Sequence, residues 1–191
     1  AFVRGSIDKD KYQTKIKSLL SLADLVKNTL DTDNQIQSAC NSFVDAKGSM
    51  FLGRGSSFPI ALEGALKLKE LAYIHAEGYP AGEMKHGPLA LIEDGMPVVV
   101  IAPRDYYYNK TISNMQEVIA RGAKVLLITN KSTDEIFSEN IWQKIEVENT
   151  DDDLLPFLIT IPLQKLAYHS ALKKGYDIDK PRNLAKSVTV E

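Results

Sequence analysis

The sequence predicts an α/β protein in which a parallel sheet lies between layers of helices. Short, continuous apolar runs occur at residues 50–52, 97–102 and 125–129, as in strands that are buried on both faces. Longer segments with apolar residues at helical spacing lie between these runs. Strands that alternate with helices form parallel sheets covered on both sides, so a three-layer α/β fold is expected. A chain of 191 residues can form one large domain, or one domain with a lead-in arm.

The amino-terminal part of the chain predicts a helical lead-in. Apolar residues recur near helical spacing through residues 8–30. The polar stretch at 31–34 ends this helix and offers caps for a second one at about 35–45, which ends before Gly48. We therefore expect residues 1–48 to form a helical arm that precedes the sheet.

The first strand of the sheet leads through a glycine-rich turn into a helix. Residues 50–52 precede Gly53-Arg54-Gly55-Ser56-Ser57, and a helix is then expected over about 57–77. A loop at 78–82 and a short helix at about 88–92 follow.

The remaining elements continue the alternation of strands and helices. They are a strand at 97–102, a helix at 106–121, a strand at 125–129, a short helix around Ile136, an edge strand at 144–147 and a helix at about 154–174. Gly175 is expected to end the last helix. We therefore expect one domain over residues 49–174 and a C-terminal tail over 175–191.

The composition is that of a soluble globular protein and argues against several classes of partner. Hydrophobic residues make up 44% of the chain and charged residues 25%. The formal net charge of −2 gives no basic surplus for nucleic acid or for an anionic membrane. No apolar run approaches the roughly 20 residues that a membrane span needs. Cys40 is the only cysteine and cannot form an internal disulfide, which predicts a reducing, cytoplasmic location.

The turn after the first strand is a candidate ligand site. In parallel sheets, ligands bind beyond the carboxyl ends of the strands. The backbone at Gly55, Ser56 and Ser57 opens a helix, and a helix amino end can hold an anion such as a sugar phosphate. Phe58 stands where a dinucleotide fingerprint would have its third glycine, and no acid ends the next strand. The alternative is a plain turn between a strand and a helix.

The helix that follows carries charged residues on one face. Glu63, Lys67 and Glu70 are spaced i, i+4 and i+7. One interpretation is a solvated stripe of ion pairs, each worth only about 0.2–0.5 kcal/mol. The other is a catalytic cluster. Spacing alone favours the ion-pair stripe, but this face begins directly after the candidate ligand turn, which narrows the difference between the two interpretations.

One of the three histidines is a candidate acid–base group. His86 is followed by Gly87 and Pro88, which argue against a regular helix, and a loop histidine near the rim of a parallel sheet can move protons. His75 and His169 fall within expected helices and are expected to pack there.

The C-terminal tail holds a single lysine in its last nine residues, Lys186. A frayed terminus is the default for a chain end. However, Leu184, Val188 and Val190 alternate with other residues, which indicates that the tail docks. A lysine becomes a nucleophile only when a shielded site lowers its pKa, so a docked tail could present Lys186 for covalent chemistry.

Several of these segments resemble the glucosamine-6-phosphate synthases, which are glutamine–fructose-6-phosphate aminotransferases. The segments are FLGRG, ALEGALKLKE, HAEG…GEMKHGPLALI and the ending PRNLAKSVTVE. The resemblance is to the C-terminal part of the sugar isomerase (SIS) half of the family and covers about residues 50–191. It implies the three-layer SIS fold, and residues 1–48 fit the stretch that joins the two SIS repeats. It also implies a homodimer.

The resemblance implies a role for each candidate residue. Lys186 corresponds to the lysine that forms a Schiff base with C2 of open-chain fructose 6-phosphate, and Glu70 to the carboxylate that moves a proton between C1 and C2. Lys67 and Glu63 correspond to its neighbours. His86 corresponds to the ring-opening histidine, which in the family the adjacent subunit lends.

The resemblance also implies what the chain needs from elsewhere. Ala185 corresponds to a backbone contact to the sugar, whereas the family's phosphate loop lies in the first SIS repeat, which this sequence lacks. The ammonia that turns fructose 6-phosphate into glucosamine 6-phosphate comes from a glutaminase domain, which is also absent here. No metal or organic cofactor is implied. The alternatives are an amino-sugar phosphate isomerase or deaminase, a non-catalytic SIS module that binds sugar phosphate, and a purely structural half-domain.

Overall fold

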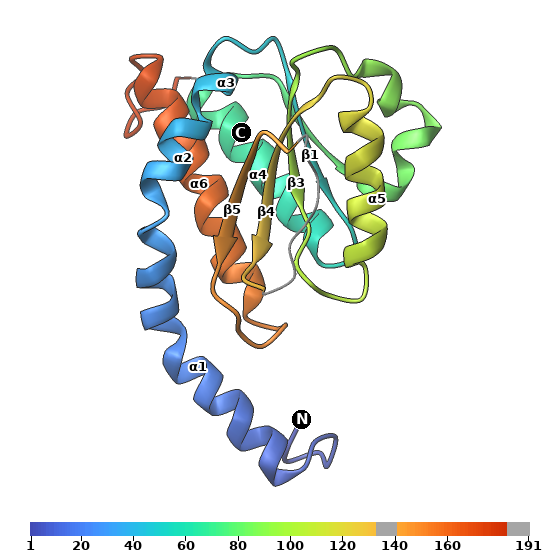
Figure 1. Ribbon diagram of the computed structural model, residues 1–191. Helices are drawn as coiled ribbons and strands as arrows, with labels where there is room; N and C mark the ends of the chain where they lie inside the picture. Colours follow the sequence, from blue (N-terminus) through green and yellow to red (C-terminus); the bar gives the residue numbers. More distant parts are fainter. Residues whose placement is uncertain (133–140, 183–191) are drawn as a thin grey trace, which may run out of the picture.

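The computed structural model of the protein describes residues 1–132 and 141–182. Within these ranges, five parallel strands form one sheet in the order β2-β1-β3-β4-β5 (Figure 1). The strands are β1 (Ser49–Gly53), β2 (Ala76–Pro80), β3 (Pro97–Ile101), β4 (Lys124–Asn130) and β5 (Gln143–Val147). The expected α/β fold with a parallel sheet is confirmed.

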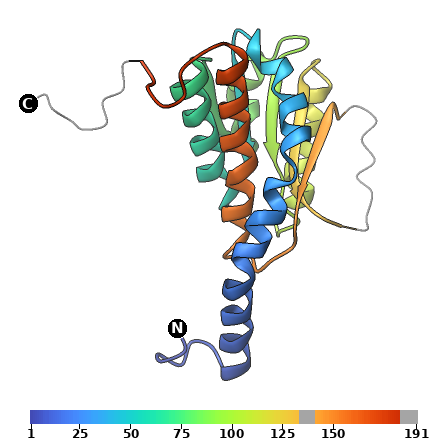
Figure 2. The ribbon, with the colours of Figure 1, turned by 90° about the vertical axis from the view of Figure 1, so that its left-hand side faces the viewer.

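Helices cover both faces of the sheet, which gives the expected three layers (Figures 1 and 2). The helices on one face are α2 (Asp33–Ala39), α3 (Asn41–Val44), α4 (Ser57–Ala72) and α6 (Leu155–Lys173). Those on the other face are α5 (Tyr108–Ile119) and the short 3-10 helices η1 (Ala81–His86) and η2 (Pro88–Leu91). The second lead-in helix is thus divided into α2 and α3.

The strands carry apolar side chains into both layers, because successive residues of a strand point to opposite faces. Phe51 and Val99 belong to the core under α4 and α6, whereas Leu52 and Val100 belong to the core under α5 and η1. Gly64 lets α4 lie close to the sheet, since an added Cβ would come within 2.9 Å of Phe51 Cδ1. These contacts explain why the strands are continuous apolar runs in the sequence.

Helix α1 (Lys9–Leu30) runs away from the sheet and projects beyond it (Figures 1 and 2). Asp8 caps it, since its side chain accepts a hydrogen bond of 2.7 Å from Lys11 N. Near its C-terminal end, Leu22, Leu25 and Val26 pack against the core. The helix expected over residues 8–30 is therefore confirmed.

The helix expected over residues 57–77 is shorter, and part of the loop expected at 78–82 is a strand. Tyr73 ends α4 because it adopts the left-handed conformation at φ 54°. The chain then turns back and β2 pairs with β1. Gly78 permits this pairing beside α4, since an added Cβ would lie 2.9 Å from Leu62 N. His75 therefore lies outside any helix and is largely exposed, contrary to expectation.

Two other expectations lie outside the described residues. These are the short helix around Ile136 and the part of the tail from residue 183 to 191. The described start of the tail returns to α4, where Arg182 N donates a hydrogen bond of 2.7 Å to the Tyr73 hydroxyl. The Arg182 guanidinium also lies over the Tyr73 ring, 4.1 Å from its centroid.

Candidate active site

The charged cluster expected on one helix face forms on α4. Lys67 Nζ lies 2.8 Å from Glu70 Oε2 and 3.8 Å from Glu63 Oε1. The side chains of Lys67, Glu70 and Glu63 are 31%, 28% and 38% exposed. The hydrogen bond to Glu70 raises the pKa of Lys67, so the lysine is a cation between two carboxylates. About a third of each side chain is exposed, so these charges remain accessible to a ligand.

A cavity of about 580 Å³ lies beside this cluster, and Lys67 lines it. The other lining residues come from α4, α6 and the start of α2, namely Leu71, Gln164, Lys165, Tyr168, His169 and Asp33. Such a volume is typical of pockets for small organic ligands. Sequence reasoning did not assign a role to Lys165, Tyr168 or Asp33. The helical spacing of 165, 168 and 169 is visible in the sequence, but their proximity to α4 and α2 is not.

Three polar residues of this cavity wall, Asp33, Lys165 and His169, are paired with one another. Asp33 Oδ1 lies 2.7 Å from His169 Nε2 and 2.5 Å from Lys165 Nζ. The hydrogen bond with His169, followed by that from Lys165, holds the pKa of Asp33 below its usual value. His169 is buried within α6, as expected, and it ties that helix to α2.

The glycine-rich turn lies at the carboxyl end of β1, as expected. Gly55 adopts φ +54°, and an added Cβ would lie 2.6 Å from Tyr107 Cε2, so the turn is packed against that ring. Ser56 and Ser57 line a cavity of about 180 Å³.

That small cavity is an unfavourable place for a phosphate. Asp105 and Asp152 line it together with Ser56 and Ser57. Carboxylates can themselves meet the positive amino end of α4, and they repel a second anion. Burial raises the pKa of Asp105. Substrate binding by Gly55, Ser56 and Ser57 therefore stays a prediction, and these carboxylates argue against it.

His86 is the last residue of η1, and its side chain is 75% exposed. Its Nε2 lies 3.9 Å from Glu83 Oε2. Gly87 follows at φ +142°, a conformation that glycine alone adopts readily. Because η1 packs on the α5 face and α4 on the other, the described part of the chain does not bring His86 to the cluster of its own α4.

Lys186 and Ala185 lie outside the described residues. The last described residue is Arg182, and it is bound to Tyr73 at the end of α4. The end of the helix that carries Glu63, Lys67 and Glu70 therefore also holds the described part of the tail.

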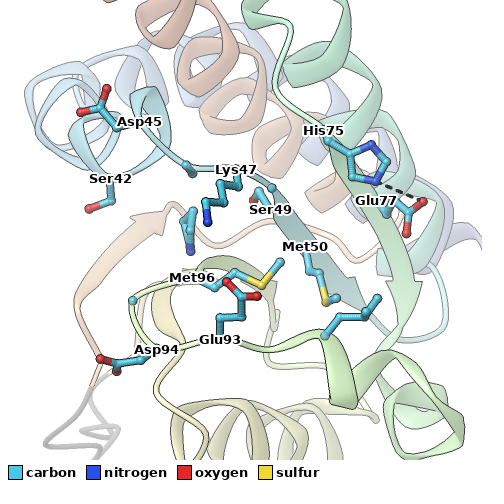
Figure 3. Close-up of a pocket in the computed structure, with 15 residues that line it drawn as sticks. Ser42, Asp45, Lys47, Ser49, Met50, His75, Glu77, Glu93, Asp94 and Met96 are labelled. Carbon is cyan, nitrogen blue, oxygen red and sulfur yellow. Dashed lines mark ion pairs between the residues drawn. The ribbon is translucent and has the colours of Figure 1, made fainter.

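Another cavity, of about 640 Å³, lies at the amino ends of the strands (Figure 3). It is lined by Ser49 and Pro97, the first residues of β1 and β3, and by the acidic side chains of Asp45, Glu77 and Glu93, among others. None of the candidate residues in the described chain lines it. This cavity is therefore not the candidate active site.

Neither a metal site nor a membrane span is present in the described ranges. No group of three or more His, Cys, Asp and Glu side chains in residues 1–132 and 141–182 could hold a metal ion. No helix in the same residues is both long enough and apolar enough to cross a membrane.

The chain is similar in sequence to isomerizing glutamine–fructose-6-phosphate aminotransferases. It is 48% identical to that of Bartonella henselae over 188 residues, which are 98% of this chain and 31% of that protein. It is 49% identical to that of Brucella abortus over 191 residues, 100% of this chain and 32% of that protein. The chain therefore spans about a third of the length of these relatives.

Solved structures agree with the sequence relatives. The C-terminal domain of glucosamine-fructose-6-phosphate aminotransferase from Francisella tularensis matches with a TM-score of 0.87 and 44% identity, over 92% of this chain and 49% of that one. A glucosamine-6-phosphate deaminase from Thermotoga maritima matches with a TM-score of 0.66 and 26% identity, over 86% and 48% of the chains.

A family model for the SIS domain matches residues 42–174. The expected resemblance to the SIS half of the aminotransferases is thus confirmed. Because the match covers more than half of its length, the chain belongs to the SIS domain family.

Proposed function

We propose that this chain is the second SIS unit of a sugar isomerase that converts fructose 6-phosphate and ammonia into glucosamine 6-phosphate. The observation that carries the proposal is the cluster of Glu63, Lys67 and Glu70 on α4. It occurs in a chain 48% identical to an isomerizing glutamine–fructose-6-phosphate aminotransferase. Isomerisation needs a group that can accept a proton, and a partly exposed carboxylate paired with a lysine that lines a cavity meets that need.

Lys186 is proposed as the nucleophile. Its neutral amine attacks C2 of the open-chain ketose, and loss of water gives an imine. Ammonia then adds to C2 and the lysine amine leaves, which regenerates Lys186 and gives a sugar imine. An imine withdraws electrons from its neighbours and so acidifies the protons on C1.

Glu70 is proposed as the group that moves a proton between C1 and C2. It removes a proton from C1 and returns one to C2, which converts the ketose imine into the amino aldose. Lys67, held at 2.8 Å, orients the Glu70 carboxylate, and Glu63 at 3.8 Å holds Lys67 from the other side.

His86 is proposed to open the sugar ring in the site of a neighbouring subunit. Ring opening moves a proton between O5 and the anomeric hydroxyl, which suits an imidazole. Its exposure at the end of η1, on the face of the sheet away from its own α4, supports delivery to a partner in a homodimer.

The remaining parts of the enzyme are proposed to lie outside this chain. The Asp105 and Asp152 carboxylates beside Ser56 and Ser57 support a phosphate site elsewhere, in a first SIS repeat. A glutaminase domain would supply ammonia. The chain spans 49% of the Francisella domain and 31% of the Bartonella protein, which leaves room for both.

Exchange of the C1 protons with solvent tests the role of Glu70. In the complete isomerase domain, Glu70→Gln is expected to bind fructose 6-phosphate but to lose C1 exchange in D2O by about 10²–10⁴-fold, since glutamine cannot accept a proton. Glu63→Gln is the matched control. Exchange at the wild-type rate in Glu70→Gln would remove Glu70 from this role, and loss in Glu63→Gln instead would transfer the role to Glu63.

A deaminase is the second candidate, because of the match to the Thermotoga glucosamine-6-phosphate deaminase. The two reactions differ in direction. Release of ammonia from glucosamine 6-phosphate, with no synthesis from fructose 6-phosphate and ammonia, would favour the deaminase. Binding of either sugar without turnover would favour a non-catalytic module.

A further inference from the structure

Arg54, in the glycine-rich turn, is directed away from the candidate ligand cavity. Its Nη1 donates a hydrogen bond of 3.3 Å to Asn114 Oδ1 on α5, and Asn114 is buried. Its guanidinium also lies against Gly82 in η1. A Cβ added to Gly82 would overlap Arg54 Nη2 and would come 3.0 Å from Arg54 Cζ. Arg54 therefore joins the end of β1 to α5 and η1.

A second polar pair joins the same two helices. Lys85 Nζ in η1 lies 2.9 Å from Glu117 Oε1 on α5. Asn114 and Glu117 are three residues apart, so they lie on one face of α5. The Glu117 side chain is 23% exposed and that of Lys85 63%, so the pair lies at the surface with its carboxylate partly shielded from water.

Arg54 packs against the start of η1, and the Lys85–Glu117 pair ties its end to α5. Gly82 lies near its start and Lys85 directly before its last residue, His86. Between them, Met84 is fully buried in the core under α5. Three contacts, at Gly82, Met84 and Lys85, thus hold the backbone that carries His86, while the imidazole remains exposed.

We propose that Arg54, Asn114, Lys85 and Glu117, here called the η1 clamp, are positioning residues for His86. The inference rests on the proposed role of His86 in ring opening. Proton transfer requires donor and acceptor within hydrogen-bond reach, and a displacement of about 1 Å can cost about 100-fold in rate. An imidazole held by its own side chain alone would not meet that requirement, whereas the η1 clamp fixes the backbone that carries it.

A substrate that needs no ring opening tests the clamp in the complete enzyme. The 5-deoxy analogue of fructose 6-phosphate lacks the hydroxyl that closes the ring and stays open. We expect Arg54→Lys and Glu117→Gln to lower kcat on fructose 6-phosphate by about 10-fold or more, and to leave kcat on the open analogue within about 2-fold. Lysine lacks the planar fork that reaches both Asn114 and Gly82.

The controls separate the clamp from the proposed function. Glu148→Gln removes a comparable ion pair with Lys131 near the far edge of the sheet. It should leave kcat unchanged on both substrates. His86→Ala should lose fructose 6-phosphate turnover and keep the open analogue. Equal loss on both substrates in His86→Ala would contradict the role of His86 itself. The clamp proposal alone would be overturned if His86→Ala lost turnover of fructose 6-phosphate only, while Arg54→Lys and Glu117→Gln, like Glu148→Gln, left kcat on both substrates unchanged.

Mixed dimers supply a readout that a general loss of folding would not mimic. If Arg54 acts through His86 of its own subunit, a mixed dimer of one Arg54→Lys subunit and one Lys186→Ala subunit should have about one working site of two. A mixed dimer of one Arg54→Lys subunit and one His86→Ala subunit should have no working site. Rescue in the opposite pattern would place Arg54 with the Lys186 site and overturn the inference. No rescue by either partner, after confirmed subunit exchange, would also overturn it.

Discussion

At the scale of single residues, Asp33 shows how one carboxylate joins two helices. Its Oδ1 meets both His169 on α6 and Lys165 one turn earlier. Because its pKa is lower in the folded protein, Asp33 contributes stability above the unfolded pKa of about 3.9. That contribution is lost as the pH falls through the folded pKa.

Asp33→Asn is therefore expected to lower the free energy of unfolding by about 1 kcal/mol at pH 7, a modest value because the Asp33 side chain is 40% exposed. The difference from wild type should shrink as the pH falls below about 3. Denaturant unfolding at both pH values measures it. Asp31→Asn, an exposed neighbour, is the control. Equal stability of Asp33→Asn and wild type at pH 7 would show that the contacts contribute nothing.

The charged residues of α4 could be predicted from the sequence, but the strength of each pairing could not. The spacing of Glu63, Lys67 and Glu70 placed them on one face, and the structure joins them. Rotamers decide that Lys67 lies closer to Glu70 than to Glu63, and spacing does not report rotamers. The partner of Arg54 was beyond prediction, because Asn114 is 60 residues away in the chain.

At the scale of elements, apolar runs predicted β1, β3 and β4 because buried parallel strands need apolar residues on both faces. Strand β2 was missed because it lies at the edge and is only partly buried. Its glycine and proline are typical of turns. The end of α4 was missed for a related reason. Tyr73 occupies a left-handed position where glycine or asparagine is usual, so no residue signalled the stop.

Tyr73 also anchors the described part of the tail through Arg182, and this yields a prediction. Tyr73→Phe keeps the ring under the Arg182 guanidinium but removes the hydroxyl that accepts from Arg182 N. We expect local opening of the segment before residue 183 to become easier by about 0.5–1.5 kcal/mol. Hydrogen exchange of the Arg182 amide should then accelerate by about 2- to 12-fold. Tyr106→Phe, at an exposed tyrosine, is the control, and an unchanged Arg182 rate would contradict the anchor.

At the scale of the whole molecule, exposed apolar side chains indicate surfaces that need a partner. Leu62 and Leu66 of α4 and Phe157 and Leu172 of α6 are exposed on helices that cover the same face of the sheet (Figure 2). The chain spans about half of the Francisella domain that it matches. We propose that the other half of such a domain covers part of this surface and brings the phosphate site.

The chain alone is therefore expected to bind fructose 6-phosphate weakly. Its own candidate donors at Ser56 and Ser57 share their cavity with Asp105 and Asp152. Losing phosphate contacts worth about 3 kcal/mol weakens binding by about 100-fold. Calorimetry with the chain and with the complete isomerase domain measures the difference. Equal affinity would show that the turn after β1 holds the phosphate after all.

The most direct test of the account is covalent trapping at Lys186. The complete isomerase domain is incubated with fructose 6-phosphate and borohydride, which reduces an imine to a stable amine, and its intact mass is measured. The account predicts the addition of one reduced sugar phosphate, located at Lys186 by peptide mapping and absent in Lys186→Arg, since arginine stays protonated and forms no imine. Trapping to the same extent in Lys186→Arg would contradict the account.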